Sequence, residues 1–462
     1  MAAMRPKALP RRIAAKVGSN RVRTMRDVET SAPAGPTPDP APSPVGTGGW
    51  RGLTPLRHVG RAFQHRNYRL YFAGQLLSLM GTWIQSVAQS WLVYQLTGSA
   101  MLLGAVNFAT QAPILLLAPL AGTLADRVDR RRLIMMTQAA LMSLAFVLAG
   151  LTLTGAIEVW HILVLATLQG IVNSFDMPAR QSFVVEMVGK DDLPNAIALN
   201  STMFNSARMI GPAVGGLLVA LVGEGWCFLI NAASFLAVLM GLAHMRLRLR
   251  AAPTAPTGTQ GVSEGIAFVA KTEPFRSLLL LVALVSLAGM PFTVLLPVFA
   301  TLLQAGPEGY GLLMGAVGLG ALAGALRLAA QKDVRRLERL PALATGGLAL
   351  GLVLFAQAPS LWSAAAALLL VGFCLITETA TSNTLLQSLV PDRLRGRVMA
   401  CYMMCFAGLA PFGALAAGTA AHHIGAAATV SIGGGICLLG ALSFHLRRRL
   451  FAGGGDPRPP AA

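Results

Sequence analysis

The chain has 462 residues, of which 54% are hydrophobic and only 12% are charged, and its mean hydropathy is +0.61. A soluble protein of this length would carry about twice this share of charged residues, so the composition favours a polytopic membrane protein over a soluble one. The net charge of +18 would suit a nucleic-acid partner, but in membrane proteins basic residues more often set the insertion topology and attract anionic lipid.

The N-terminal segment, residues 1–66, is predicted to be a disordered tail. It carries 12 Lys and Arg against 3 Asp and Glu, and its stretch SAPAGPTPDPAPSPVGTGG is poor in apolar residues. Such a composition cannot offset the entropy cost of ordering the chain. It also lacks the apolar core of about 7–15 residues that a secretory signal needs. We therefore interpret it as a basic cytoplasmic tail, with an over-long start and Met25 as an internal start as the alternative.

Beyond the tail, apolar stretches recur with short breaks. A bilayer-spanning helix needs about 20 apolar residues, and twelve stretches reach or approach this length. They cover residues 70–94, 100–125, 133–154, 159–179, 195–222, 226–245, 277–301, 309–330, 341–357, 361–386, 398–420 and 424–446. The chain is therefore predicted to be an all-α integral membrane protein with twelve transmembrane helices.

Basic residues fall on alternate loops between these helices. With the N-terminus inside, the inner loops contain the clusters at 127–132, 246–250, 332–339 and 393–397. The outer loops near 95–99, 155–158, 223–225, 302–308, 358–360 and 421–423 contain no Lys or Arg. This distribution follows the positive-inside rule. It supports the count of twelve and predicts a plasma-membrane protein with both termini in the cytoplasm.

The two halves of the chain resemble each other. APLAGTLADRVDRRRLIMM at 118–136 is echoed by GALAGALRLAAQKDVRRLERL at 320–340, and Gly122 maps onto Gly324 at an offset of 202 residues. Internal repeats of this kind are typical of secondary transporters. The predicted parts are an N-terminal six-helix bundle at 67–246, a cytoplasmic linker at 247–276, a C-terminal six-helix bundle at 277–449 and a C-terminal tail at 450–462.

The loop after the second helix concentrates charge in GTLADRVDRRR at residues 122–132. Gly122 would allow a neighbouring helix to approach closely. Asp126, just beyond the membrane edge, can accept hydrogen bonds from a helix N-terminus or pair with arginine. Such a contact can form in one conformation and break in another. The alternative is that the arginines only hold the loop inside.

This loop resembles the major facilitator signature G-x-L-A-D-[RK]-x-[GD]-R-[RK]-[RK], and the resemblance extends over about residues 68–446. It implies the major facilitator fold, two pseudo-symmetric six-helix bundles, with this loop latching the cytoplasmic side. The latch residues that it implies are Gly122, Asp126, Arg127, Arg130, Arg131 and Arg180. It further implies that Asp126 interacts with the start of the eleventh helix, near residues 396–399.

On the fifth helix, MIGPAVGG at 209–216 resembles the antiporter motif G-P-x-x-G-G, which seals the path between the halves of exporters. Its residues are Gly211, Pro212, Gly215 and Gly216. Glycines let a neighbouring helix approach closely, and the proline permits a kink; ordinary tight packing is the alternative. Stretches 67–100, 175–183 and 199–216 resemble the exporter subgroup that contains enterobactin exporters and macrolide efflux proteins.

One stretch departs from the pattern of proton-coupled relatives. Many of them carry L-x-x-R-x-x-Q-G on the fourth helix, whereas LVLATLQG at 163–170 has Ala166 at the arginine position. That arginine is linked to proton coupling, and the first helix contains no acidic residue. The resemblance thus implies proton antiport, and this departure argues against it.

Three ionisable residues fall within predicted spans. Each costs at least about 2.5 kcal/mol to insert, so Asp176, Arg208 and Glu378 are expected to face a partner or a wet cavity. We expect Arg208 to be the fixed cation of the cavity, Asp176 its partner, and Glu378 the first candidate for proton exchange. The alternative for Asp176 is a structural pair with Arg180 or Arg208. The amides predicted to complete this substrate and proton cavity are Gln85, Gln89, Asn107 and Asn205, with helix-to-helix hydrogen bonding as their alternative role.

The sequence therefore predicts a secondary active exporter of an amphipathic small molecule, such as a drug or a siderophore, acting by alternating access and proton antiport. A facilitator or importer with the same fold and a membrane scaffold are the alternatives. Without an HExxH or Walker motif, and with only His422 and His423 adjacent, we expect no enzyme activity, cofactor or metal. The expected partners are a small-molecule substrate, protons and membrane lipid, without nucleic acid, and the protein is expected to be a monomer.

Overall fold

The structure is a computed structural model that describes residues 60–245, 262–331 and 334–447. Within these ranges, the side chains at 118–119, 125–126, 262–266, 274, 334–336 and 392 lie outside the described part. Every regular element of the described residues is a helix. This agrees with the predicted all-α class.

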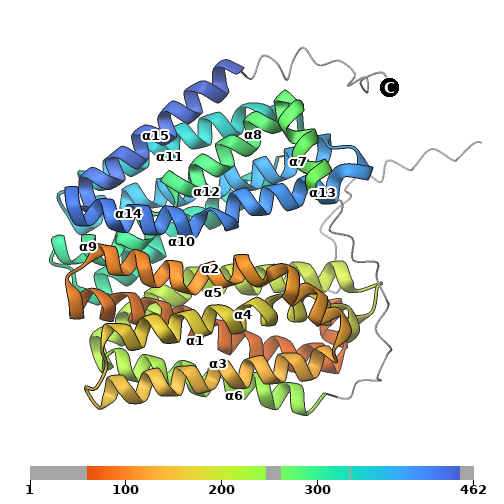
Figure 1. Cartoon of the computed structure of the whole chain (residues 1–462), viewed down its shortest axis with the longest axis vertical. Coiled ribbons are helices and arrows are strands. Elements are labelled where there is room, and N and C mark those ends of the chain that lie inside the picture. The colour runs from red at the N-terminus through yellow and green to blue at the C-terminus, as the bar shows by residue number, and fades with distance from the viewer. Residues whose placement is uncertain (1–59, 246–261, 332–333, 448–462) are drawn as a thin grey trace, which may run out of the picture. The chain divides into compact units, whose positions relative to one another are not determined.

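The N-terminal bundle consists of six long helices, preceded by the short 3-10 helix η1 (Arg61–Gln64). The helices are α1 (Arg66–Thr97), α2 (Ala100–Arg127), α3 (Arg130–Leu153), α4 (Val159–Val188), α5 (Leu193–Val222) and α6 (Glu224–Ala243). Within the bundle, α1 packs against α5 and α6, α2 against α4, and α3 against α4 and α6. Figure 1 shows these helices running nearly parallel to one another.

The C-terminal bundle repeats this plan with two interrupted spans. Its elements are α7 (Val262–Lys271), α8 (Glu273–Leu284), η3 (Val285–Gly289), α9 (Phe292–Leu302), α10 (Gly306–Ala329), η4 (Val334–Arg339), α11 (Leu340–Ala356), α12 (Leu361–Leu389), α13 (Asp392–Met403), η5 (Met404–Gly408), α14 (Ala410–Ile424) and α15 (Ala426–Arg447). The seventh span is α8, η3 and α9, and the eleventh is α13, η5 and α14. The first element, α7, lies within the predicted linker at 247–276.

Polar residues and glycines mark where several helices begin and end. Ser99 caps α2 by accepting a hydrogen bond from the backbone of Leu102. Asp129, inside the charged loop, caps α3 by accepting from the backbone of Arg132 over 3.1 Å. Gly98 ends α1 in the left-handed conformation, with φ 61°, which a residue without Cβ adopts at little cost. One acidic residue of the charged loop is therefore a helix cap.

Eleven segments of the described residues are long and apolar enough to cross a membrane, and they match every predicted span except the first. The remaining span is α1, with 32 residues, which exceeds the about 20 that a bilayer requires. Glutamines, serine and threonine along one face make it less apolar than the others. With α1, the helices form the predicted twelve-span architecture of two six-helix bundles.

The seventh and eleventh spans each contain a π-helical segment, η3 and η5, that the apolar pattern did not predict. A π-helical turn leaves the regular ladder of backbone hydrogen bonds. Here the hydroxyl of Ser286 in η3 donates to the carbonyl of Phe406 in η5 over 2.7 Å. This bond links the two interruptions directly.

The described structure begins inside the segment predicted to be a disordered tail. Ala62 in η1 is fully buried, and its backbone donates to the side chain of Asn195. Arg61 and His65 both approach the carboxylate of Asp192 at the start of α5, at 3.2 and 2.9 Å. Residues 60–66 therefore belong to the folded bundle, and the rest of the predicted tail, 1–59, lies outside the described residues.

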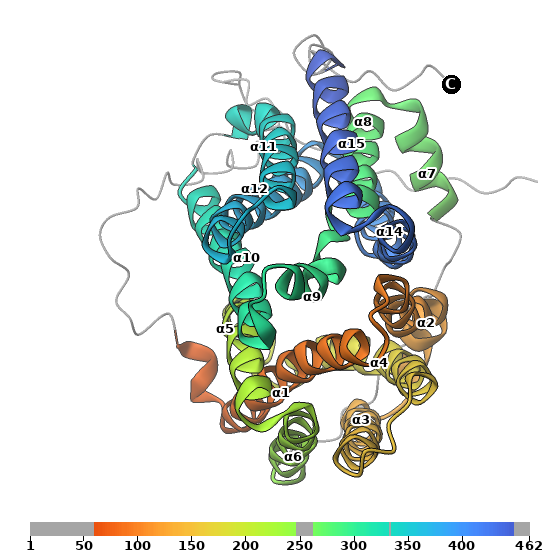
Figure 2. The ribbon, with the colours of Figure 1, turned by 90° about the vertical axis from the view of Figure 1, so that its left-hand side faces the viewer.

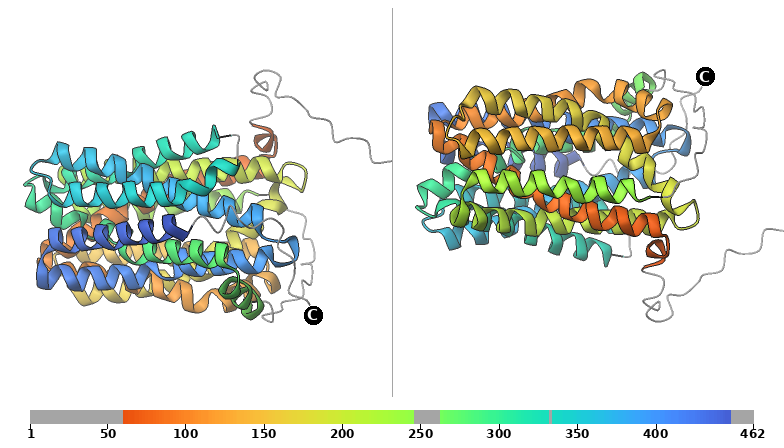
Figure 3. Two further views of the ribbon diagram at one scale, coloured as in Figure 1. Left: turned by 90° about the horizontal axis from the view of Figure 1, so that it is seen from above. Right: turned by 90° about the horizontal axis from the view of Figure 1, so that it is seen from below.

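The two bundles meet through glycines. A Cβ at Gly104 on α2 would lie 2.7 Å from the carbonyl of Ala414 on α14, and a Cβ at Gly216 on α5 would lie 2.7 Å from Cα of Gly311 on α10. Figure 2 looks along the helices and shows α2 beside α14 and α5 beside α10. Figure 3 shows the helices of both bundles sharing a common direction.

We call the end of the bundles that carries residues 127–132 and 393–397 the basic end. Gly104 and Gly418, on α2 and α14, and Gly216 and Gly311, on α5 and α10, lie near the other end of their helices. Among the described residues, the substantial contacts between bundles involve only α9, α10 and α14 on the C-terminal side, and none of them involves α13. The bundles are therefore joined mainly away from the basic end.

Candidate functional site

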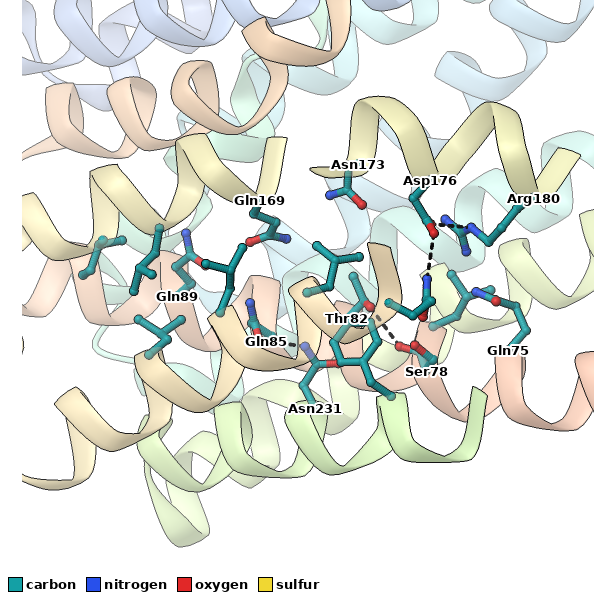
Figure 4. A pocket seen from close by; sticks show the side chains of 18 residues that line it. Gln75, Ser78, Thr82, Gln85, Gln89, Gln169, Asn173, Asp176, Arg180 and Asn231 are labelled. Atoms are coloured by element: carbon teal, nitrogen blue, oxygen red, sulfur yellow. Dashed lines mark hydrogen bonds and ion pairs between the residues drawn. The ribbon is translucent and has the colours of Figure 1, made fainter. Parts of the chain in front are cut away.

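A cavity of about 70 Å³ lies inside the N-terminal bundle, between α1, α3, α4 and α6. We call it the polar chamber (Figure 4). Its polar lining consists of Gln75, Ser78, Thr82, Gln85, Gln89, Gln138, Gln169, Asn173, Asp176, Arg180 and Asn231. Leucine and isoleucine side chains and Phe235 form the apolar part of the wall.

Two helices supply most of the polar lining through regular spacing. On α1 the polar positions are 75, 78, 82, 85 and 89, and on α4 they are 169, 173, 176 and 180. Steps of three and four residues place side chains on one face of an α-helix. The chamber therefore lies between two polar helix faces, and α3 and α6 add Gln138 and Asn231.

Asp176 is the only acidic residue of the chamber lining, and its side chain is fully buried. Thr137 and Gln138 on α3 donate hydrogen bonds to its Oδ1 over 2.7 and 3.0 Å. Its Oδ2 lies 2.6 Å from Nε of Arg180, one turn further along α4. Oδ1 therefore accepts two hydrogen bonds, whereas Oδ2 faces the guanidinium as an ion pair without a hydrogen bond from a described residue.

The structure thus confirms the alternative in which Asp176 pairs with Arg180, and the predicted pair of Asp176 with Arg208 is wrong. Residues four apart share one face of a helix, so Arg180 is already aligned with the carboxylate. Arg208 lies on α5 and makes no ion pair with a described residue. The hydrogen-bond partners on α3 were not predicted, because nothing in the sequence fixes how α3 faces α4.

The amides of the chamber differ in how well they are satisfied. Asn231 donates to Oε1 of Gln85 over 2.7 Å and so joins α6 to α1. Oε1 of Gln75 and Oε1 of Gln138 are buried and accept no hydrogen bond from a described residue. The chamber therefore contains both satisfied and unsatisfied amide groups.

Of the predicted cavity residues, only Gln85, Gln89 and Asp176 line the polar chamber. The amides Asn107 on α2 and Asn205 on α5 lie outside it. Asn205 is exposed and donates to the carbonyl of Ser201 on its own helix over 2.8 Å. Sequence reasoning missed Asn173 and Gln138. Asn173 could have been found from the three-and-four spacing on α4, whereas no such spacing points to Gln138 on α3.

Glu378 lies in the other bundle, on α12, and is fully buried. Ser382, one turn further along, donates to its Oε1 over 2.9 Å. Its Oε2 has no hydrogen-bond partner among the described residues. The hydroxyl of Tyr402 on α13 donates to the carbonyl of Thr379, the residue after Glu378, over 3.0 Å. Glu378 is therefore a buried acid without a basic partner in the described part of the chain.

The arginines of the charged loop contact other helices of the N-terminal bundle. Arg130 forms an ion pair with Glu186 on α4 at 2.6 Å, and Arg131 donates to the carbonyl of Ala243 at the end of α6 over 3.0 Å. Arg180, which the resemblance assigned to the latch, forms an ion pair with Asp176. Glu186 was missed, although the loop and the end of α4 are both charged.

Gly122 was expected to allow a close helix approach, but a Cβ there would meet no atom within 4 Å. The same is true of Gly396, at the predicted contact point on the eleventh span. Arg127 is exposed, and the side chain of Asp126 lies outside the described residues. The predicted contact of Asp126 with the eleventh span therefore lies outside the described residues.

The motif at 209–216 lies at the contact between bundles. A Cβ at Gly211 would lie 2.5 Å from Cβ of Trp83 on α1, and one at Gly215 would lie 3.1 Å from Cα of Ile84. The carbonyl of Pro212 and the backbone of Gly216 face Gly311 on α10. Two of the glycines therefore receive α1 within the bundle, and the third receives the other bundle.

Two repeated helical bundles that meet through glycines, with a polar chamber and a buried acid inside, define a membrane transporter. The family described as "Transmembrane secretion effector", a major facilitator family, matches residues 59–454. The chain belongs to this family and is a multi-pass membrane transporter, not an enzyme.

Similar proteins carry transporter names. The chain is 28% identical to the staphyloferrin A transporter of Staphylococcus aureus, over 79% of this chain and 92% of the relative. It is 31% identical to the multidrug efflux pump Tap of Mycobacterium tuberculosis, over 77% and 87%. It is 26% identical to the enterobactin exporter EntS of Shigella boydii, over 82% and 91%.

The fold is that of solved transporters. A bacterial homologue of the lysosomal transporter Spinster, in an inward-facing and unoccupied conformation, has a TM-score of 0.64. At 16% identity it covers 89% of this chain and 100% of its own. This likeness confirms the predicted major facilitator architecture.

Proposed function

We propose that the protein exports an amphipathic small molecule of the drug or siderophore class by alternating access. It would act in the plasma membrane as a monomer surrounded by lipid, with both termini in the cytoplasm. The names of three similar proteins support this proposal, since they concern efflux of drugs, export of enterobactin and transport of staphyloferrin A.

The observation that carries the proposal is the contact of the antiporter-like motif. Residues 209–216 meet α10 through Gly216, Gly311 and Gly318, while the basic ends lack a comparable contact among the described residues. In this proposal the motif seals the outer side, and the charged loop with Arg130 and Glu186 closes the cytoplasmic side when the bundles rock.

We further propose that export is coupled to protons through Glu378. An ionised carboxylate buried without a cation is costly, so the closed bundle favours the neutral acid. When Glu378 gains access to water on one side of the membrane, its proton can leave. Glu378 must then bind another proton before the closed bundle can form again. Ala166 stands where proton-coupled relatives carry arginine, and it is buried in an apolar cluster. In this proposal Glu378 therefore acts without an arginine at position 166.

A cell assay tests the transport function and its direction. A strain lacking the protein is loaded with hydrophobic dyes and drugs and assayed for siderophore release, with and without the gene on a plasmid. We expect the plasmid to lower intracellular accumulation of at least one compound, and collapse of the proton gradient to remove the effect. Increased accumulation on expression would instead identify an importer.

The coupling role is tested in proteoliposomes with Glu378→Gln. We expect gradient-driven transport to fall at least about tenfold, while exchange of labelled for unlabelled substrate without a gradient persists. The matched control is Glu308→Gln, an exposed acid at the start of α10, which we expect to leave both activities unchanged. Gradient-driven transport at the wild-type rate by Glu378→Gln would refute the coupling role.

A further inference from the structure

The polar chamber lies within the N-terminal bundle, and residues of α1, α3, α4 and α6 line it. Two of its walls are α3 and α6, which make no substantial contact with the C-terminal elements among the described residues. Gln138 from α3 and Phe235 and Asn231 from α6 all line it. It is therefore an internal feature of one bundle.

The chamber presents unsatisfied hydrogen-bonding groups to whatever occupies it. Gln75 and Gln138 are each only 2% exposed, and their Oε1 atoms accept no hydrogen bond from the described residues. A buried acceptor without a partner is destabilising. Gln89, Gln169 and Asn173 also line the chamber without a hydrogen bond to another described residue. An occupant that donates and accepts would satisfy both kinds of group.

The charge of the chamber selects against ions. Its acid, Asp176, forms an ion pair with Arg180 through Oδ2 and accepts two hydrogen bonds at Oδ1. A cation would find its carboxylate already engaged, and an anion would compete with Asp176 for Arg180. Amides, by contrast, offer both donors and acceptors without charge.

The size of the chamber limits the occupant. About 70 Å³ accommodates about five water molecules, at roughly 10–15 Å³ each, and lies far below the about 300 Å³ of the smallest drug-sized pockets. The chamber therefore fits water or one short arm of a larger molecule.

We propose that the polar chamber is a binding site for neutral groups that both donate and accept hydrogen bonds. Water fills it in the empty carrier, and a hydroxyl or amide arm of the cargo displaces that water during transport. The cargo part of this inference rests on the proposed function, whereas the water part does not.

Hydroxyl-radical footprinting of the full chain in lipid nanodiscs tests the water part. Phe235 lines the chamber and is 5% exposed, whereas Phe228, two turns earlier on α6, is 0% exposed and does not line it. We expect radicals formed from chamber water to label Phe235 at least about fivefold faster than Phe228. Gln75→Met should lower that rate severalfold, and the control Asn205→Leu, outside the chamber, should not. Equal, slow labelling of both phenylalanines would overturn the site.

The cargo part is tested with two probes in the same assay. Chloramphenicol is neutral and carries hydroxyl and amide groups, whereas ethidium is a permanent cation without hydroxyl groups. We expect saturating chloramphenicol to protect Phe235 and ethidium to leave it exposed. Asn173→Leu should weaken chloramphenicol binding at least about tenfold, and Asn205→Leu should not.

The outcomes separate the two parts and the proposed function. Labelling of Phe235 that chloramphenicol does not reduce would overturn the cargo part and support the water part. A different outcome separates the site from the proposed function. If chloramphenicol protects Phe235 but expression of the protein does not lower the accumulation of any compound in cells, the site is supported and the proposed export is refuted.

Discussion

The ion pair inside the N-terminal bundle yields a prediction whose magnitude follows from its geometry. Thr137 and Gln138 both donate to Oδ1 of Asp176, whereas Arg180 faces Oδ2. Asp176→Asn can keep its carbonyl oxygen at the Oδ1 position and so retain both hydrogen bonds. The amide nitrogen then replaces Oδ2, so the substitution removes the ion pair and turns a hydrogen-bond donor toward the guanidinium.

Loss of one partner from a buried pair costs about 3–5 kcal/mol. Asp176 is fully buried, but the side chain of Arg180 is 22% exposed, so water screens the freed guanidinium in part. We therefore expect Asp176→Asn to lower the free energy of unfolding by about 3 kcal/mol, the lower end of that range. Arg180→Met leaves a carboxylate with two hydrogen bonds and no cation. We expect it to lower the free energy of unfolding further, by about 4 kcal/mol.

The assay is equilibrium unfolding of the purified protein in mixed micelles, followed by helical circular dichroism. The double variant Asp176→Asn with Arg180→Met contains neither charge, so its loss should fall short of the sum by at least about 1 kcal/mol. Asp191→Asn, an exposed acid in the loop before α5, is the control and should stay within about 0.5 kcal/mol of wild type. Additive losses, or an Asp176→Asn variant as stable as the control, would refute the reasoning.

Three further predictions concern the contacts between helices. Gly216→Leu would place a side chain against the carbonyl of Pro307. We expect α5 and α10 to separate there, which should increase thiol labelling at that end and slow transport severalfold. Arg130→Glu should slow transport by repelling Glu186, and the charge-swapped double variant should restore most of the rate. Ser286→Ala removes the link between η3 and η5, worth about 1 kcal/mol, and should speed amide hydrogen exchange in both segments.

Helix positions were largely predictable because a span requires an uninterrupted apolar run. The predicted ranges 100–125 and 361–386 fall within α2 and α12. The π-helical segments were not predictable in the same way, since one extra residue per turn leaves the apolar content unchanged. Pro291 and Pro411 follow the two segments, but a proline after a break also fits an ordinary kink.

The site was predictable where it is local. The pairing of Asp176 with Arg180 is an i, i+4 contact on one helix, and the sequence already contained it as an alternative. The partners Thr137 and Gln138 and the ion pair of Arg130 with Glu186 join different helices. Such contacts depend on helix rotation, which hydropathy does not specify.

The internal repeat explains why the two buried acids can differ in role. Asp176 and Glu378 are 202 residues apart, and the same offset carries Arg180 onto Ser382. In the N-terminal copy an arginine therefore follows the acid by one turn, and in the C-terminal copy a serine occupies that place. This serine donates to Oε1 of Glu378, and Oε2 has no hydrogen-bond partner among the described residues. A fixed cation and a hydroxyl give the two buried acids different electrostatic surroundings, and an acid with only a hydroxyl is stable when buried chiefly in its neutral form. If Ser382 is the reason that Glu378 exchanges protons, Ser382→Arg should supply the missing cation. We expect this variant to lose gradient-driven transport and to keep substrate exchange. Gradient-driven transport at the wild-type rate would contradict this account.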